Sequence, residues 1–460
     1  MKGRDTAWVV EAIGGELLAG DPAAPGPRRA IVDTRVARAG DLFFGLPGER
    51  SDGGLLAPDA FAAGAWGVVV APEHGERAVA AAPPGAVAIA AARGGADGGP
   101  GARSGPLAAL QALARAWRRE LACRVVGVTG STGKTSTKDI LAALLEPHRV
   151  THANSENLNT EIGLPLTILE AAHGTEVLVL EMAMRGEGQI AELAAIAEPD
   201  VGVIVNVGPV HLELLGTVER VAAAKAELIR DLRADGACVV PAAEPLLERH
   251  LRDDLDTTTF GPGGEVMLLS FAAHGDRPGG IAEIEARGER VLLDLPYSEP
   301  YNLLNTLAAV GAAQALGVRP NGVVQAAFSS LRGEIVELAG GVTVVNDCYN
   351  ANPMSMRAAL KHLAETPAQR RVAVLGAMAE LGGASHVFHR EIGEEASALG
   401  IDVLITVGRQ ALDYSYGYDG ESYSAPTPEE AGALLAEIAL PGDRVLVKGS
   451  RSAGLERVLA

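Results

Sequence analysis

The sequence is short of several residue classes, and each shortage excludes a kind of protein. Three cysteines occur in 460 residues, far apart and odd in number, which excludes a disulfide framework or a cysteine zinc cluster and favours a reducing cytoplasm. No apolar run of about 18 residues is free of charge, Gly or Pro, so we expect no transmembrane span. Asp5, Glu11 and Glu16 interrupt the first residues, so we expect no apolar core of a signal peptide there.

Basic residues and aromatic residues are also scarce. Lys and Arg number 39 against 58 Asp and Glu, giving a net charge of −19, so we expect no nucleic-acid partner, because a polyanion needs a basic face. Aromatics make up 4% of the chain, but 48% of it is hydrophobic and 21% charged, which is typical of a globular protein. The length predicts about three domains with packed cores.

The most informative segment is Arg124–Thr135, which reads RVVGVTGSTGKT. A β-branched strand runs into a small-residue turn, and a helix follows. Glycines let backbone N–H groups approach phosphate oxygens, and the helix N-terminus adds a positive dipole end. Lys134 can reach the β and γ phosphates, and the Thr135 hydroxyl can bind Mg²⁺. The loop is the short GxxGKT form, because Val128 stands where a full Walker motif has Gly. A chance Gly-rich turn is the alternative. The predicted ATP-binding residues of the loop are Gly130, Ser131, Thr132, Gly133, Lys134, Thr135 and Ser136.

Composition divides the chain into three α/β blocks. Arg93–Pro106 is rich in Gly and has no apolar periodicity, which is typical of a flexible joint. We expect a small N-terminal α/β domain at 1–102, a central P-loop domain with a parallel sheet at 103–331, and a C-terminal Rossmann-like domain at 332–460. Expected strands include Ala30–Asp33, Asp41–Gly45, Gly67–Val70, Val177–Leu180, Val201–Val207, Ala237–Val240, Val342–Val345, Arg371–Leu375, Val403–Val407 and Arg444–Val447.

Two candidate metal ligands follow expected strands, where ligands gather in open parallel sheets. Glu181 comes directly after a strand, so its carboxylate could hold Mg²⁺ beside Thr135. A solvated acid at a strand end is the alternative. His211 lies in a turn, four residues beyond Val207, and by itself it is typical of a polar surface residue.

Lys225 lies on the apolar face of the helix expected over Thr217–Leu232. Its neighbours at helical spacing are Val218, Val221, Leu228 and Ile229. A buried ammonium is costly and has a lowered pKa, and a neutral amine can react with CO₂ to give an anionic carbamate. The alternative is a buried stem with its head in water, and periodicity alone favours this second interpretation.

Polar clusters at further strand–helix junctions suggest ligand recognition. His152–Pro165 and Val345–Ser355 are both rich in side-chain amides. Asn and Asp are also common turn formers, but two such clusters favour a binding site for a polar ligand. Lys448 and Arg451 follow another strand, where their charges could face an anionic substrate or simply be solvated.

Taken together, these motifs resemble the Mur ligase family of ATP-dependent amide ligases in peptidoglycan precursor synthesis, over nearly the whole chain. Within it, NDCYNANP at 346–353 resembles the ligases that add D-alanyl-D-alanine to UDP-N-acetylmuramoyl-tripeptide, and the Asp-Asn-Pro-Arg signature of the ligases that add the third residue is not found. The other matching segments are 33–35, 40–53, 129–138, 157–169, 180–229 and 445–458.

The resemblance implies roles for individual residues. Lys134, Glu181, His211 and Lys225 form the implied catalytic set, with Thr135, Glu181, His211 and a carbamylated Lys225 organising Mg²⁺. Asn302, Asn305, Arg332 and Asp347 are implied to bind ATP. The implied substrate ligands are Thr34, Arg35, Asn157, Asn159, Thr160, Asn350, Asn352, Lys448, Ser450 and Arg451. Three positions depart from the family pattern: Gly54 replaces His, Tyr301 replaces His, and Ala377 replaces Asp.

The implied reaction joins D-alanyl-D-alanine to UDP-N-acetylmuramoyl-tripeptide through an acyl phosphate and releases ADP and phosphate. We expect a monomer that acts on these small molecules. Two alternatives stay open. One is another ligase of the superfamily, of the type that adds the third residue, or of the folylpolyglutamate or cyanophycin synthetase type. The other is a nucleotide-binding regulator without ligase activity.

Overall fold

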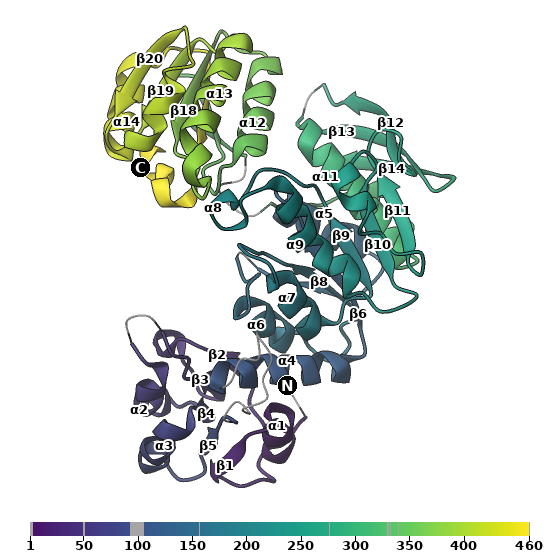
Figure 1. Cartoon of the computed structure of the whole chain (residues 1–460), viewed down its shortest axis with the longest axis vertical. Coiled ribbons are helices and arrows are strands. Elements are labelled where there is room, and N and C mark those ends of the chain that lie inside the picture. Colours follow the sequence, from purple (N-terminus) through teal and green to yellow (C-terminus); the bar gives the residue numbers. More distant parts are fainter. Residues whose placement is uncertain are drawn as a thin grey trace.

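The computed structural model describes residues 3–48, 51–92, 105–155, 157–275, 277–328, 331, 333–338 and 340–459. Within these ranges the chain forms three α/β units, each built around its own sheet and following one another along the long axis of the molecule (Figure 1). The expected fold class is confirmed. The expected joint at 93–106 and both domain boundaries involve residues outside the described ranges, so their positions stay predictions.

In the N-terminal unit, the described strands form a sheet in the order β1-β5-β4-β3-β2, in which only the β1–β5 pair is antiparallel. β3, β4 and β5 are buried along their whole length, as short apolar runs in parallel sheets usually are. The elements are β1 (Glu16–Ala19), β2 (Arg29–Ile31), β3 (Asp41–Phe44), β4 (Gly67–Val70), β5 (Val87–Ala90), α1 (Thr6–Ile13), α2 (Ala57–Ala62) and α3 (Gly75–Ala81).

The central unit holds the longest of the described sheets, in the order β15-β14-β13-β12-β11-β10-β9-β6-β8-β7. Its strands are β6 (Arg124–Thr129), β7 (Thr151–Ala153), β8 (Val177–Glu181), β9 (Val201–Ile204), β10 (Ala237–Pro241), β11 (Asp256–Phe260), β12 (Val266–Ala273), β13 (Gly280–Ala286), β14 (Glu289–Leu295) and β15 (Gly322–Val323). Its helices are α4 (Gly105–Leu121), α5 (Lys134–Leu145), α6 (Gly163–Glu170), α7 (Gln189–Ala197), α8 (Leu212–Leu215), α9 (Val218–Arg230), α10 (Pro245–Glu248) and α11 (Pro300–Ala315).

One part of this sheet differs from the expected parallel arrangement. β12, β13 and β14 pair antiparallel, and residues along β13 and β14 alternate between buried and more exposed positions. That alternation is typical of a sheet with one face against the core and one toward solvent. The parallel strands β6, β8, β9 and β10 are apolar along most of their length, and they carry the phosphate loop and Glu181 at their carboxyl ends.

In the C-terminal unit, the described strands have the order β16-β17-β21-β18-β19-β20, and β16 is antiparallel to the rest. Helices cover both faces of this sheet, as in a Rossmann-like unit. The elements are β16 (Glu334–Leu338), β17 (Val342–Asn346), β18 (Arg370–Gly376), β19 (Val403–Val407), β20 (Glu421–Ala425), β21 (Asp443–Lys448), α12 (Pro353–Glu365), α13 (Ser385–Ala398) and α14 (Pro428–Ile438).

The N-terminal and central units share an apolar core. One cluster of buried side chains runs from Val9 and Phe44 through Trp117 of α4 to Leu178 of β8. The C-terminal unit has two clusters of its own, one on each face of its sheet. Among the described helices, none is long and apolar enough to cross a membrane.

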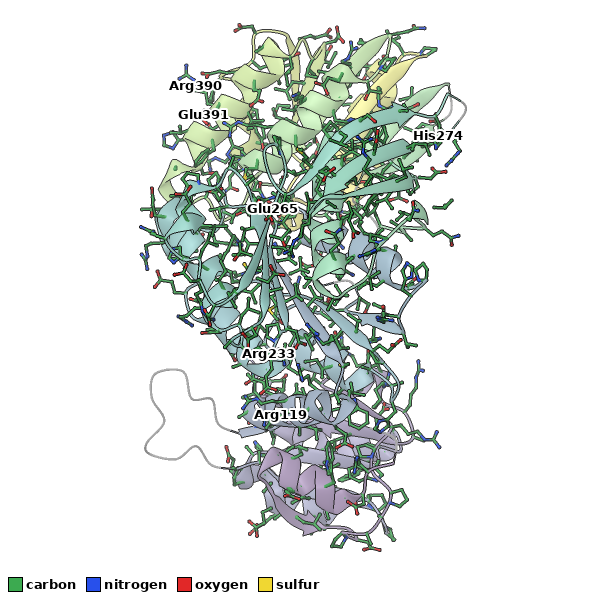
Figure 2. All side chains as sticks on the ribbon, turned by 90° about the vertical axis from the view of Figure 1, so that its right-hand side faces the viewer. Arg119, Arg233, Glu265, His274, Arg390 and Glu391 are labelled. Carbon is green, nitrogen blue, oxygen red and sulfur yellow. The ribbon has the colours of Figure 1, made fainter. Side chains whose placement is uncertain are left out.

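The buried acid Asp200 holds the backbone at the amino-terminal end of β6, in the central sheet. The Asp200 carboxylate is 1% exposed, accepts a 2.7 Å hydrogen bond from Val125 N, and pairs with Arg233 at 2.9 Å. A buried carboxylate needs such donors. Figure 2 shows Arg233 and Arg119 at the end of the central unit nearest the N-terminal unit, away from the carboxyl ends of the strands.

Candidate functional site

A cavity of about 890 Å³ lies between the central and C-terminal units. The phosphate loop, the end of β8 and the segment around His211 line it from one side. The loops after β17, β18 and β21 line it from the other. It brings together these predicted site residues: Ser131, Thr132, Gly133, Lys134, Thr135, Ser136, Asn157, Asn159, Thr160, Glu181, His211, Asn302, Asn305, Asp347, Asn350, Asn352, Lys448, Ser450 and Arg451.

Five predicted residues are not placed in this lining. Gly130 and Lys225 belong to the surrounding structure, and Thr34 and Arg35 lie in the N-terminal unit. Arg332 lies outside the described residues. The sequence therefore predicted residues on both walls of one cavity, because its motifs follow strands whose carboxyl ends share an edge.

The phosphate loop has the local structure that its sequence predicts. β6 ends at Thr129, α5 begins at Lys134, and Gly133 between them has φ +74°, a left-handed conformation that favours glycine. A Cβ on Gly133 would overlap Asn305 Oδ1, so the loop packs directly against α11. Lys134 Nζ donates to Gly130 O at 3.0 Å, which holds its ammonium over the loop.

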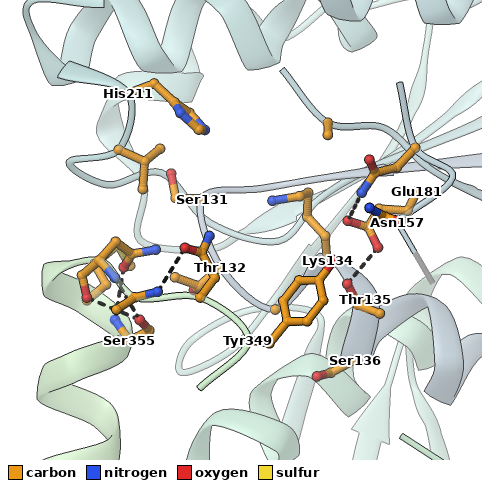
Figure 3. A pocket seen from close by; sticks show the side chains of 18 of the residues that line it. Ser131, Thr132, Lys134, Thr135, Ser136, Asn157, Glu181, His211, Tyr349 and Ser355 are labelled. Atoms are coloured by element: carbon orange, nitrogen blue, oxygen red, sulfur yellow. Dashed lines mark hydrogen bonds between the residues drawn. The ribbon is translucent and has the colours of Figure 1, made fainter. Parts of the chain in front are cut away.

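Glu181 is held on both carboxylate oxygens. Thr135 Oγ1 donates to Oε2 at 2.6 Å, and Asn159 Nδ2 donates to Oε1 at 2.7 Å. These bonds compensate for the burial of Glu181, which is 2% exposed, because a buried carboxylate needs hydrogen-bond donors. Figure 3 shows Thr135 and Glu181 on one side of the cavity and His211 on the other.

Asn154 fixes the backbone at Glu181, and sequence reasoning did not single it out. Its Oδ1 accepts from Glu181 N at 2.8 Å, and its Nδ2 donates to Glu181 O at 3.2 Å. The buried Lys138 donates to Asn154 O at 2.6 Å. The amide-rich stretch containing Asn154 was a recognisable signal, but the partner of each amide depends on the fold.

The pair of Thr135 and Glu181 fits a magnesium ion. A hydroxyl and a carboxylate oxygen 2.6 Å apart are hard donors, and Mg²⁺ usually takes one or two protein oxygens and completes its shell with water and phosphate. Among the described residues, no group of three or more His, Cys, Asp and Glu side chains could hold a metal ion. The role of His211 as a direct ligand therefore stays a prediction.

Asn206 is a further site residue that sequence reasoning missed. Its Oδ1 accepts from Ser131 N at 3.0 Å and Thr132 N at 2.9 Å. Its Nδ2 donates to Thr132 Oγ1 at 2.9 Å and to Thr132 O at 3.2 Å. The contacts join residues about 75 positions apart, so no local pattern indicated them. One carboxamide thus shapes the first half of the phosphate loop.

His211 contacts the C-terminal unit. Its φ is +54°, it precedes α8, and its Nδ1 forms a hydrogen bond with Glu380 Oε2. The hydrogen bond from His211 lowers the pKa of the Glu380 carboxyl group, although burial opposes that shift. Glu380 was not predicted as a site residue.

Lys225 is buried in α9 with 1% of its surface exposed. The expectation from periodicity alone, a head in water, is therefore wrong: Lys225 is among the largest fully buried side chains, and its helix α9 packs against α7, β6 and β9. Burial, with a smaller effect from the Lys134 ammonium, lowers the pKa of Lys225 well below its ordinary value. The chain thus holds an amine whose neutral form is favoured.

The C-terminal wall of the cavity is tied together by Lys448 and Ser450. Lys448 is 2% exposed, and its Nζ donates to Asp347 Oδ2 at 2.6 Å and to Asn350 O at 3.1 Å. Ser450 Oγ donates to Ala351 O at 3.2 Å. Their polar groups therefore join the loops after β17 and β21. Arg451 lines the cavity and is more exposed than either.

Near α11, Asn305 Nδ2 donates to Asn302 Oδ1 at 3.3 Å. Both asparagines are buried, so the amides form a preformed pair beside the phosphate loop. Tyr301, one of the departures from the family pattern, lines the cavity beside them. Burial raises the pKa of its phenol, which therefore stays neutral.

In the N-terminal unit, the Arg35 guanidinium pairs with Asp33 at 2.6 Å. Gly54, a second departure, lies under His74: a Cβ on Gly54 would overlap the imidazole. His74 Nε2 is 2.8 Å from Asp52 Oδ2, and this hydrogen bond lowers the pKa of Asp52. An imidazole from another segment therefore fills the space that a larger residue at position 54 would need.

Comparison with known proteins agrees with this geometry. Residues 128–313 match the Mur ligase middle domain, and residues 331–451 match the Mur ligase, glutamate ligase domain. A UDP-N-acetylmuramoyl-tripeptide–D-alanyl-D-alanine ligase of Bacillus subtilis is 33% identical, over 96% of this chain and 96% of its own length.

Solved structures share the fold over nearly the whole chain. The crystal structure of MurF from Acinetobacter baumannii matches with a TM-score of 0.85 and 26% identity, over 99% of this chain and 97% of that one. MurF ligase from Thermotoga maritima, in complex with ADP, matches with a TM-score of 0.79 and 32% identity, over 94% of this chain and 96% of that one. Because two family models together match most of the central and C-terminal units and a relative is similar over 96% of its length, this chain belongs to the Mur ligase family.

Proposed function

We propose that the chain joins D-alanyl-D-alanine to UDP-N-acetylmuramoyl-tripeptide at the expense of ATP, with ADP and phosphate as products, in peptidoglycan precursor synthesis. The observation that carries this proposal is the shared cavity, in which a phosphate loop and an amide-rich wall face one another. The Bacillus subtilis relative, named for this reaction, supports the choice of substrates. Cell shape and cell division would depend on the product.

Amide formation from a carboxylate needs activation, because a carboxylate oxygen is a poor leaving group. We propose that the tripeptide carboxylate attacks the γ-phosphorus of ATP, giving an acyl phosphate and ADP. The dipeptide amine then attacks the acyl carbon, and phosphate leaves with the C–O bonding electrons. Lys134 and the N-terminus of α5 face the phosphates in this proposal and offset the charge of the transferring group.

Thr135 and Glu181 would hold Mg²⁺, since their oxygens lie within 2.6 Å of one another. When bound, the ion would neutralise charge on the phosphate oxygens. Asn154 and Asn159 keep the Glu181 carboxylate and backbone in place. In the N-terminal unit, Thr34 and Arg35 are proposed to bind the uridine nucleotide part of the substrate.

We further propose that Lys225 carries a carbamate. Its burial and its lowered pKa favour the neutral amine, which adds to CO₂ and releases one proton. Carbon-13 NMR of protein equilibrated with ¹³CO₂ should show a carbamate resonance that is lost in Lys225→Ala. A spectrum identical in both proteins would contradict the modification.

The three cysteines are free and buried, which suits the cytoplasm that we propose as the location of the protein. We also expect the protein to be a monomer.

The reaction is tested by phosphate release with ATP and Mg²⁺, adding UDP-muramoyl-tripeptide and D-alanyl-D-alanine singly and together. We expect release only with both, and a pentapeptide product by mass. Lys134→Ala should lower the rate about 100-fold or more, whereas the exposed Lys361→Ala should not. Absence of release with both substrates would contradict the proposal; ADP binding that persists would then indicate a regulator or a ligase for other substrates.

A further inference from the structure

A three-residue contact crosses the junction between the central and C-terminal units. Glu380 lies in the loop after β18. Its Oε2 is hydrogen-bonded to His211 Nδ1, and its Oε1 lies 3.3 Å from Arg185 Nε. Its backbone carbonyl accepts a 3.3 Å hydrogen bond from Glu213 N. The side chains of Glu380, His211 and Arg185 all line the cavity. Both carboxylate oxygens and the backbone of Glu380 are thus engaged by the other unit.

The hydrogen bond with Glu380 selects one tautomer of the His211 imidazole. A carboxylate only accepts hydrogen bonds, so His211 Nδ1 must carry the hydrogen that it shares with Glu380. Nε2 is then the nitrogen that can act elsewhere in the cavity. A carboxylate on one ring nitrogen commonly sets the orientation of a functional histidine in this way.

The position of Glu380 is set by the C-terminal unit and not by the contact itself. Met378 N donates to His389 Nε2 at 2.9 Å, and Ala379 N donates to Ser450 Oγ at 2.9 Å. Ser450 N donates to Ala377 O at 3.0 Å. Hydrogen bonds within the C-terminal unit therefore hold the loop that carries Glu380.

The backbone conformation of the residues at the junction shows that the central and C-terminal units meet in one closely defined arrangement. His211 has φ +54° and Glu380 has φ +62°, a region that residues other than glycine rarely adopt. Gly382 has φ +58°, and a Cβ there would lie 3.1 Å from Glu213 Cα. Two left-handed residues that meet across a junction indicate a contact that the surrounding structure maintains.

We propose that Glu380 is a positioning residue: docking of the C-terminal unit brings its carboxylate onto His211 and fixes the imidazole for its work in the cavity. Domain docking and the assembly of the reaction site are thereby coupled through one side chain. The effect on ligation rests on the proposed function, whereas the effect on the ring of His211 does not.

The direct test is the ring nitrogen spectrum of protein labelled with ¹⁵N-histidine, with His211 assigned by comparison with His211→Asn. In the wild type, Nδ1 should show the shift of a protonated nitrogen. In Glu380→Ala the His211 signals should move toward the mixture of tautomers of a free imidazole, and Glu380→Gln should move them less. The exposed Glu365→Ala is the matched control and should leave them unchanged.

The second test is a double-mutant cycle on ligation. Glu380→Ala should lower kcat about 10- to 100-fold, with KM for ATP nearly unchanged. Glu380→Gln should recover part of the loss. The double variant with His211→Ala should be no slower than His211→Ala alone, because both changes remove the same function. ADP binding, measured by calorimetry, checks that each variant keeps its central unit intact.

Unchanged His211 shifts in Glu380→Ala would overturn the proposal, and so would losses that multiply in the double variant. If the wild type does not ligate these substrates, the proposed function fails while the spectra still decide the role of Glu380. Altered spectra with full ligation in Glu380→Ala would overturn the coupling of docking to the reaction.

Discussion

Gly133 shows how strongly a single residue constrains the phosphate loop. Its φ of +74° disfavours a side chain, and a Cβ would overlap Asn305 Oδ1. Gly133→Ala should therefore weaken ADP binding about 10-fold or more, since the left-handed backbone alone costs roughly 1–2 kcal/mol and the overlap adds to that cost. Isothermal titration calorimetry measures the change in Kd.

Gly288→Ala is the control, because it tests the left-handed backbone conformation without a steric overlap. Gly288 has φ +84°, and a Cβ at this position would meet no other atom within 4 Å; it lies in the β13–β14 turn. Gly288→Ala should lower stability but leave the Kd for ADP unchanged. Equal affinity of wild type and Gly133→Ala would show that the loop adjusts and that its Gly is not required for nucleotide binding.

At this scale, local motifs were predictable and long-range partners were not. Lys134, Thr135 and Glu181 follow strands in recognisable order, so the sequence indicated their site. Asn206 and Glu380 carry no local signal, because their hydrogen-bond partners Thr132 and His211 lie 74 and 169 positions away, respectively. Lys225 shows a third case: its apolar face was predictable, but full burial depends on the sheet beneath α9.

At the scale of elements, Asn206 joins the segment after β9 to the phosphate loop. Asn206→Ala removes four hydrogen bonds to Ser131 and Thr132, so we expect ADP binding to weaken about 10- to 100-fold, at roughly 1 kcal/mol per bond with partial compensation by water. Asn206→Asp should be at least as damaging, because it keeps the acceptor but adds charge near the phosphates. Calorimetry compares both with the exposed Asn321→Ala, for which we expect wild-type affinity.

The loop after β18 gives a pH dependence. Burial lowers the pKa of His389, whose Nε2 accepts from Met378 N at 2.9 Å, so the fold favours the neutral ring. The contribution of the neutral His389 ring to folding stability is fully present above the ordinary pKa of about 6.5. It is lost as the pH falls from about 6.5 through the lowered pKa of the folded state. The free energy of unfolding should fall by at most about 1.4 kcal/mol per pH unit in that window.

Urea denaturation over a pH series tests this dependence. The wild type should lose stability below about pH 6.5, and His389→Gln should lose less over the same range, because it has no titrating ring. Asp413 and the Ser385 carbonyl oppose the shift, which limits its size. Parallel pH profiles for the two proteins would contradict the role assigned to His389.

Element types were predictable where the pattern was continuous. The buried parallel strands of the central and C-terminal units read as apolar runs, and β8, β18, β19 and β21 lie where the sequence placed them, within a residue or two at each end. The antiparallel strands β12 to β14 were not predicted, because their alternating burial mixes charged and apolar residues. Sheet order also depended on contacts between distant segments, which no local period encodes.

At the scale of the whole molecule, the units are joined in two ways. The N-terminal and central units share one apolar core, whereas the C-terminal unit keeps its own cores and meets the central unit at the cavity and at the His211 segment. A junction without a shared apolar core is more easily opened than one with such a core. Contacts at the junction should therefore control docking.

Substitutions at Gly208 and Met354 test whether contacts at the junction control the docking of the C-terminal unit. A Cβ on Gly208 would overlap Met354 Sδ of the C-terminal unit. Because the flexible Met354 side chain can shift in part, Gly208→Ala should disfavour docking by about 1 kcal/mol, the lower end of the usual cost of overpacking. Small-angle X-ray scattering should show a larger radius of gyration, and kcat for ligation should fall. Met354→Ala removes the obstructing side chain, so the double variant should return both measurements toward the wild type. A double variant as impaired as Gly208→Ala would mean that the added methyl acts within the central unit, through Ser131 Oγ, which accepts from Gly208 N at 2.9 Å.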